Sequence, residues 1–328
     1  MVLLNLLTRT LITAVLGSIS VGALAQTQSD NYPSKVIHVI CNFPPGNGSD
    51  IAVRYFSKQL ADISGATVIV ENKVGAFGMM GARTVAESKP DGYTIFITGV
   101  STVLSGAKYL YKDVPYNPTK DFLPVSMLFK LPFVMTVDPK LPMKTVSDVT
   151  DYIKSGKAKG TYGTAANPGT ISAEMYLSRA NAKLDRVTYR DAKQTQTELV
   201  NGLLDFVFFD AASTAAQVTE NRLRAIAVTS AERLPVMPDV PTMAESGLAG
   251  YEMILTWGVV VPAKTPDATV DKLQEWFTKI SARAETQEFI KKMGGIPAAG
   301  DRKRLSEVLQ KETHDWAEYV RLARIEPQ

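Results

Sequence analysis

The sequence is poor in the residues that form disulfides and metal sites, with one cysteine and two histidines among 328 residues. The single cysteine, Cys41, excludes an intramolecular disulfide. It follows the apolar residues 36–40, so we expect a buried thiol rather than a reactive one. His38 and His314 have no cysteine or histidine partner at the spacing of a metal site, and we expect no bound metal.

The chain also lacks a strong charge of either sign. Lysine and arginine together number 36 and aspartate and glutamate 33, which gives a formal net charge of +3, and the two signs are interspersed. This pattern argues against a nucleic-acid partner. An anionic ligand would have to be held by local groups. A chain of 328 residues exceeds the usual size of one hydrophobic core, which favours two domains.

Long apolar runs are scarce as well. Residues 11–17 are mostly apolar, they follow Arg9, and the small-residue sequence Ala23-Leu24-Ala25 comes shortly after. This order predicts that residues 1–25 are a signal for export to the periplasm, cleaved after about Ala25. A membrane anchor is the competing interpretation, but a span needs about 20 apolar residues and a Gly-Ser pair interrupts this run. We expect a mature protein that does not itself span a membrane.

Short apolar segments alternate with helical ones along the next part of the chain. We expect strands at residues 36–40, 67–71 and 94–98, with helices at 49–60 and 81–88. This βαβαβ order predicts a parallel sheet with right-handed crossovers.

The same pattern begins again after a stretch marked by prolines at residues 122–132. The expected strands are 133–137, 161–164, 187–189, 206–209, 224–229 and 254–261, and the expected helices are 146–154, 171–181, 198–204 and the C-terminal segment to about residue 324. Two such units in tandem predict an α/β protein of two lobes joined by two crossing strands, with a ligand cleft between them. We expect residues 26–126 and 255–328 to form lobe 1 and residues 127–254 to form lobe 2.

The first loop with binding potential covers residues 43–50 and joins an expected strand to a helix. Its glycines allow close approach of a ligand, and a helix N-terminus favours an anion. The alternative is that the loop only makes a turn and caps the helix through Ser49 or Asp50. Neither a dinucleotide fingerprint nor a P-loop is present. The candidate ligand contacts are Phe43, Gly46, Asn47, Gly48, Ser49 and Asp50.

Two further loops join strands to helices. Residues 75–81 place Phe77 and Gly78 in a glycine-rich turn, where the aromatic ring could stack on a ligand or the small residues could only serve close packing. Residues 162–170 would present hydroxyl and N–H groups across the cleft, so that two helix N-termini converge on one anion. The candidates there are Thr164, Ala165, Asn167, Thr170 and Ser172.

Two charged residues end expected strands of the second lobe. Arg190 could pair with a ligand carboxylate through two hydrogen bonds, or form only a surface salt bridge. We expect Asp210 to orient an amide, a water or Arg190. The chain has no G-x-S-x-G motif, no serine with a plausible histidine partner and no carboxylate pair with a metal motif, so we expect neither an enzyme nor a cofactor.

Several of these segments resemble the substrate-binding proteins of tripartite tricarboxylate transporters, the TctC or Bug family. The matching segments are Tyr32-Pro33-Ser34-Lys35, Phe43-Pro44-Pro45-Gly46 with Asp50 and Arg54, Glu71-Asn72-Lys73-Val74-Gly75-Ala76 with Gly78 and Gly81, Pro90-Asp91-Gly92-Tyr93-Thr94, residues 223–230, residues 238–242, Glu245-Ser246-Gly247 and Gly250-Tyr251. They cover essentially all of the chain after the export signal, in order.

The resemblance implies a type II periplasmic-binding fold that closes on a small organic acid. It implies that loops 43–50 and 164–172 hold the ligand carboxylate through backbone amides and water. It also implies a monomer that delivers the acid to a membrane permease of the tripartite type. A sensory protein that presents its ligand to a membrane kinase remains an alternative, whereas the effector domain of a transcription regulator is disfavoured by the export signal.

Departures from the family pattern bear on the ligand. Asn47 and Phe77 stand where the family usually has glycine, and Thr170, Ile171 and Ser172 stand where a histidine is usual. The larger apolar side chain in the first lobe favours a ring-bearing acid, such as the aromatic dicarboxylate terephthalate.

Overall fold

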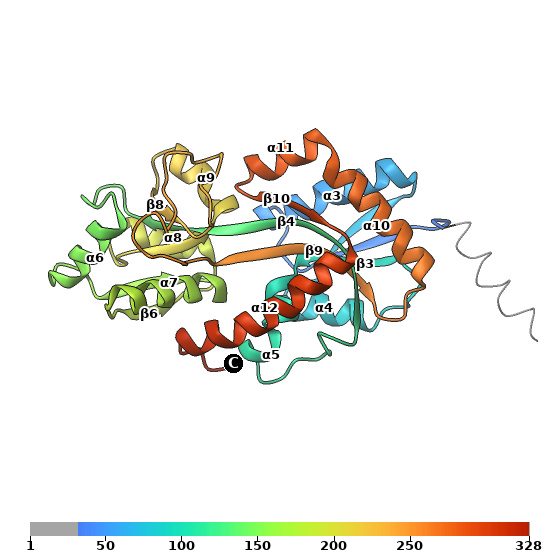
Figure 1. The fold of residues 1–328 in the computed structure, drawn as a ribbon, viewed down its shortest axis with the longest axis horizontal. Helices are drawn as coiled ribbons and strands as arrows, with labels where there is room; N and C mark the ends of the chain where they lie inside the picture. The colour runs from blue at the N-terminus through green and yellow to red at the C-terminus, as the bar shows by residue number, and fades with distance from the viewer. Residues whose placement is uncertain (1–31, 328) are drawn as a thin grey trace, which may run out of the picture.

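Two long antiparallel strands run side by side through the centre of the molecule and connect its two halves (Figure 1). They are β4 (Phe122–Val137) and β9 (Ile254–Pro262), paired from Phe122 opposite Pro262 to Pro132 opposite Ile254. The structure is a computed structural model that describes residues 32–327. Within these residues the strands form one sheet in the order β2-β1-β3-β9-β4-β7-β5-β6, with β8 and β10 also paired to β4.

The first half is built on a parallel sheet. Strand β1 pairs with β2 on one side and β3 on the other, and β9 then pairs antiparallel with β3. The strands of this half are β1 (Ile37–Cys41), β2 (Val68–Asn72), β3 (Thr94–Gly99) and β10 (Ile296–Gly300). Its helices are α3 (Gly48–Ser64), α4 (Met79–Ala86), α5 (Ala107–Leu110), α10 (Asp267–Ala282), α11 (Ala284–Lys292) and α12 (Arg302–Leu322), with short turns η1 (Ala76–Gly78) and η2 (Ser101–Ser105).

The second half repeats the parallel arrangement. Strand β5 pairs parallel with β6 and β7, while the C-terminal part of β4 pairs antiparallel with β7 and β8. Its strands are β5 (Thr161–Thr164), β6 (Asp185–Thr188), β7 (Val207–Asp210) and β8 (Arg224–Val228). Its helices are α6 (Val146–Lys154), α7 (Asn167–Ala180), α8 (Ala192–Val200) and α9 (Ala211–Thr219).

These elements confirm the prediction of an α/β fold with two crossing strands, but β4 is longer than expected. The prolines suggested a boundary at residues 122–132, yet this stretch is the part of β4 that pairs with β9. Register shifts follow Pro124 and Met127, and such bulges let a strand accommodate a residue that cannot donate to the ladder. Pro132 lies at the end of the β4–β9 ladder, where a missing donor costs little.

Three other expectations were wrong in detail. Helix α8 spans Ala192–Val200 rather than 198–204, because the Asp191 side chain caps its start and Gly202, with φ of +75°, lies beyond its end. Helix α9 was missed because its sequence is mostly small residues without an apolar stripe. The C-terminal segment contains strand β10, of sequence IPAAG, as well as helices.

One of the hydrophobic clusters of the core contains residues of both crossing strands. Phe129 of β4 and Trp257 of β9 are almost fully buried in it, together with Phe56 of α3. Helix α3 is held there because its apolar residues recur at helical spacing and face the sheet. Among the described residues no helix is long and apolar enough to cross a membrane, and the expected export signal lies outside those residues.

Candidate ligand-binding cavity

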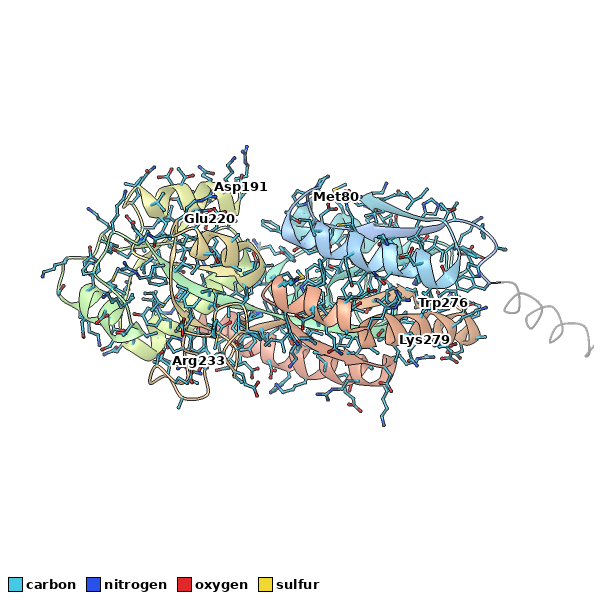
Figure 2. The ribbon with its side chains drawn as sticks, turned by 90° about the horizontal axis from the view of Figure 1, so that it is seen from above. Met80, Asp191, Glu220, Arg233, Trp276 and Lys279 are labelled. Atoms are coloured by element: carbon cyan, nitrogen blue, oxygen red, sulfur yellow. The ribbon has the colours of Figure 1, made fainter. Side chains whose placement is uncertain are left out.

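A cavity of about 410 Å³ lies where the two halves meet the crossing strands. Its lining includes residues at or just after the carboxyl ends of β1, β2, β5 and β7, which is where open α/β sheets bind ligands. The sequence-predicted residues that line it are Phe43, Asn47, Ser49, Phe77, Gly78, Ala165, Asn167 and Asp210. The predicted residues outside its lining are Gly46, Gly48, Asp50, Thr164, Thr170, Ser172 and Arg190. Figure 2 labels Asp191 and Met80, which lie on the two different halves.

The first loop brings the start of α3 to the cavity. Asn47 is the N-cap, since its Oδ1 accepts a hydrogen bond from the Asp50 N–H at 2.7 Å, so the expected capping by Ser49 or Asp50 was wrong. Gly46 adopts φ of +82°, a left-handed conformation that favours glycine. Gly46 and Gly48 border an adjoining opening of about 620 Å³ beside α8 and α9.

Asp50 lies beneath this loop, 1 % exposed, and holds it in place. Its carboxylate accepts hydrogen bonds from the Gly46 N–H at 2.8 Å, Arg54 Nε at 2.8 Å and Asn72 Nδ2 at 2.7 Å. Burial acts to raise the pKa of Asp50, but the hydrogen bonds outweigh it and lower that pKa to about 2. Cys41 is buried alongside, as expected, and burial raises the pKa of its thiol to about 11, which disfavours the reactive thiolate.

The second loop places an aromatic ring at the cavity. Phe77 has φ of +55° and is 61 % exposed, and its ring stacks on Tyr111 with centroids 5.6 Å apart and planes inclined by 23°. Gly78 is required beneath it, because a Cβ there would collide with the Asn42 side chain. Asn42 is in turn fixed by a hydrogen bond from the Thr98 hydroxyl at 2.8 Å.

The third loop presents the start of α7. Ala166 occupies the N-cap and offers no side-chain acceptor, so the first N–H groups of the helix are not capped by that residue. We expected the hydroxyls of this loop to face the cleft, and the structure shows otherwise. Thr164 and Thr170 are hydrogen-bonded to each other at 2.9 Å, and the Ser172 hydroxyl donates to the Pro168 carbonyl at 2.9 Å. All three are buried within the second half.

The two charged candidates differ in position. The Arg190 side chain is 90 % exposed and lies 3.6 Å from Asp191, outside the cavity. Asp210 lines the cavity and caps α9, accepting a hydrogen bond from the Ser213 N–H at 2.9 Å. It therefore orients an amide, one of the roles expected of it.

The charged side chains in the described lining of the cavity are two aspartates, Asp191 and Asp210. No lysine, arginine or histidine is among the described residues that line it. The N-termini of α3 and α7 both border it through Asn47 and Asn167, and only that of α7 has no side-chain cap; the N–H groups and the dipole at a helix start favour negative charge.

The chain matches the family model described as tripartite tricarboxylate transporter family receptor over residues 52–323. The chain belongs to this family. It is 31 % identical over 309 residues to a Pseudomonas sp. (strain P51) protein from the tcbD-tcbE intergenic region, covering 91 % of each chain. It resembles the solved periplasmic binding protein BugD at 27 % identity and a TM-score of 0.79, covering 90 % of this chain and all of BugD. It also resembles an R. palustris protein solved with adipate, at 24 % identity and a TM-score of 0.83, covering 91 % and 100 % of the two chains.

Membership in this receptor family makes the protein a substrate-binding protein rather than an enzyme. Several cavity residues were not among the sequence-predicted contacts, notably Asn42, Tyr111, Phe133 and Trp257. Asn42 could have been found, since it directly precedes the first loop. Tyr111 directly follows α5, and Phe133 and Trp257 belong to the crossing strands, so their approach to the cavity depends on how the halves pack.

Proposed function

We propose that this receptor captures a small organic carboxylate in the 410 Å³ cavity and delivers it to a membrane permease of the tripartite tricarboxylate type. The observation that carries the proposal is the convergence of the α3 and α7 N-termini on a cavity whose described lining contains no cationic side chain. Backbone N–H groups at helix starts are a common way to bind an anion without a buried cation. The adipate held by the R. palustris relative is a dicarboxylate of suitable size.

The ligand is proposed to be bound by closure of two lobes, residues 26–126 with 255–328 and residues 127–254. The α3 start belongs to the first lobe and the α7 start to the second, so only a closed form offers both sets of donors to one carboxylate. Binding therefore shifts the population toward the closed form, which the permease can recognise.

An aromatic acid is the proposed ligand class, with terephthalate as one member. Five aromatic side chains line the cavity: Phe43, Phe77, Tyr111, Phe133 and Trp257. Flat rings stack favourably on such surfaces. The competing class is the aliphatic acids, which gain less from these rings.

The test is a thermal-shift and calorimetric screen of the purified mature protein with adipate, citrate, benzoate, nicotinate and terephthalate. A ligand at a hundred times its Kd adds about 2.7 kcal/mol of stability, a rise in Tm of roughly 5 °C. Binding of benzoate or terephthalate in preference to adipate supports the aromatic class. Tight binding of amines or sugars, with no acid bound, contradicts the carboxylate function.

Export and assembly complete the proposal. We place the protein in the periplasm as a monomer, after removal of residues 1–25. N-terminal sequencing of the protein from the periplasmic fraction should begin at about residue 26, and its mass in solution should be that of one chain. A dimer, or an intact N-terminus, would contradict this part of the proposal.

A further inference from the structure

The wall of the cavity contains a buried polar group without a partner. Trp257 is 2 % exposed, and its Nε1 has no hydrogen-bond partner among residues 32–327. Two other buried side-chain atoms in this part of the chain share that state, Ser281 Oγ and Glu312 Oε2, but neither residue lines the cavity. An indole N–H can only donate, and buried donors in folded proteins are nearly always paired.

The indole is held in one orientation by its neighbours. Its ring lies against Phe43, with centroids 5.2 Å apart and planes inclined by 22°, and against Phe129 at 5.1 Å and 14°. Gly99 of β3 is its cross-strand partner. A Cβ added to Gly99 would lie 3.6 Å from Trp257 Nε1, so the N–H edge of the ring is the edge beside Gly99. Gly99, Phe43 and Trp257 all line the cavity.

We propose that the Trp257 indole N–H donates a hydrogen bond to an oxygen of the bound ligand and so helps to select its chemistry. The inference rests on the proposed capture of a carboxylate. A carboxylate oxygen accepts and never donates, so it complements an N–H that cannot accept. A ligand ammonium group at this place would bring two hydrogen-bond donors together without an acceptor, so binding of an amine is disfavoured.

Gly99 is part of the same selection. The N–H is buried and unpaired among the described residues, and Gly99 beside it has no side chain that could cover it or exclude a ligand oxygen. The Gly99 backbone does not have a positive φ, and an added Cβ would make only ordinary van der Waals contact with the indole. Gly99→Ala is therefore expected to fold normally while covering the donor.

The test compares the wild-type protein with Trp257→Phe and Gly99→Ala by calorimetric titration with benzoate, terephthalate and adipate. Trp257→Phe keeps a ring between Phe43 and Phe129 but removes the N–H, and a hydrogen bond to a charged group corresponds to about 10- to 100-fold in Kd. Gly99→Ala is expected to weaken binding to a similar degree. Trp316→Phe is the matched control, because it also removes a nearly fully buried indole but lies outside the cavity, and its Kd should equal that of wild type.

A spectroscopic signature separates a ligand contact from a packing role. The chain has three tryptophans, so ¹⁵N-labelled indoles give three N–H signals. The signal lost in Trp257→Phe should move downfield in the wild-type protein when it is saturated with the bound acid, while the other two stay in place. An acid that binds without moving this signal, or that binds Trp257→Phe as tightly as wild type, refutes the inference and leaves carboxylate capture intact. Failure of all three acids to bind the folded wild-type protein refutes both.

Discussion

Replacing Phe77 with glycine should separate the affinity of the cavity for a ring from the stability of the fold. The left-handed backbone of Phe77, with φ of +55°, costs a side-chain-bearing residue about 1–2 kcal/mol, which glycine would recover. Against this, the ring is 61 % exposed, and its stack on Tyr111 contributes about 0.5–1.5 kcal/mol. The two effects oppose each other, so the free energy of unfolding should change by less than about 1 kcal/mol in urea titrations.

Affinity should respond differently. A ring that stacks on an aromatic ligand contributes about 1 kcal/mol, so the Kd for benzoate or terephthalate should rise about fivefold in Phe77→Gly. The Kd for adipate, which has no ring, should stay within about twofold. Calorimetric titration of the variant with both classes measures the difference.

Met80→Ala is the control for this experiment. Met80 follows Phe77 closely, is 53 % exposed and lies outside the cavity, so its removal should change neither affinity nor the preference for rings. An equal loss of affinity for adipate and benzoate in Phe77→Gly, or no loss for either, would refute stacking by Phe77.

Three further predictions concern the groups around the cavity and the crossing strands. Asp50→Asn should lower the free energy of unfolding by about 2 kcal/mol at neutral pH, because the folded pKa of Asp50 is lowered to about 2 from its ordinary 3.8. That stabilisation is complete above the ordinary pKa and is lost as pH falls through the folded pKa. In urea titrations the free energies of unfolding of wild type and Asp50→Asn should therefore converge between about pH 4 and pH 2. A difference that stays constant with pH would contradict this prediction. Burial raises the pKa of Glu312, whose Oε1 accepts a hydrogen bond from Thr256 of β9 at 2.5 Å, so stability should fall as pH rises through the raised pKa. Glu312→Gln should abolish that decline in urea titrations across pH, and an identical pH dependence in both proteins would refute it. Asn47→Ala should lower the free energy of unfolding by about 1 kcal/mol, because the α3 cap is lost, and it should also weaken acid binding. Asp301→Ala removes the α12 cap and should cost as much stability with no loss of affinity. Equal affinities of the two variants would show that Asn47 does not contribute to binding.

Local patterns predicted much of the secondary structure of this chain. Strand β5 and helix α6 were predicted with their observed limits. A loop with Pro168 and Gly169 follows β5 closely, and α6 has a capping Thr145 and apolar residues at helical spacing. Helix α9 and strand β10 were not, since small residues such as those of IPAAG carry no periodic signal. Prolines concealed the length of β4, because bulges that accommodate them arise only when the partner strand is in place.

The candidate site was also predicted only in part from the sequence. The sequence by itself located loops 43–50, 75–81 and 162–170 at the carboxyl ends of strands, because a glycine-rich strand-to-helix turn is encoded within a few neighbouring residues. Only the tertiary structure decided which of their side chains reach the cavity. In the folded protein Asp50, Thr164, Thr170 and Ser172 form hydrogen bonds within their own halves, and the Arg190 side chain is exposed to solvent. It also brought Trp257 beside Gly99, two residues far apart in the chain, because cross-strand pairing and core packing depend on the whole fold and not on adjacent sequence.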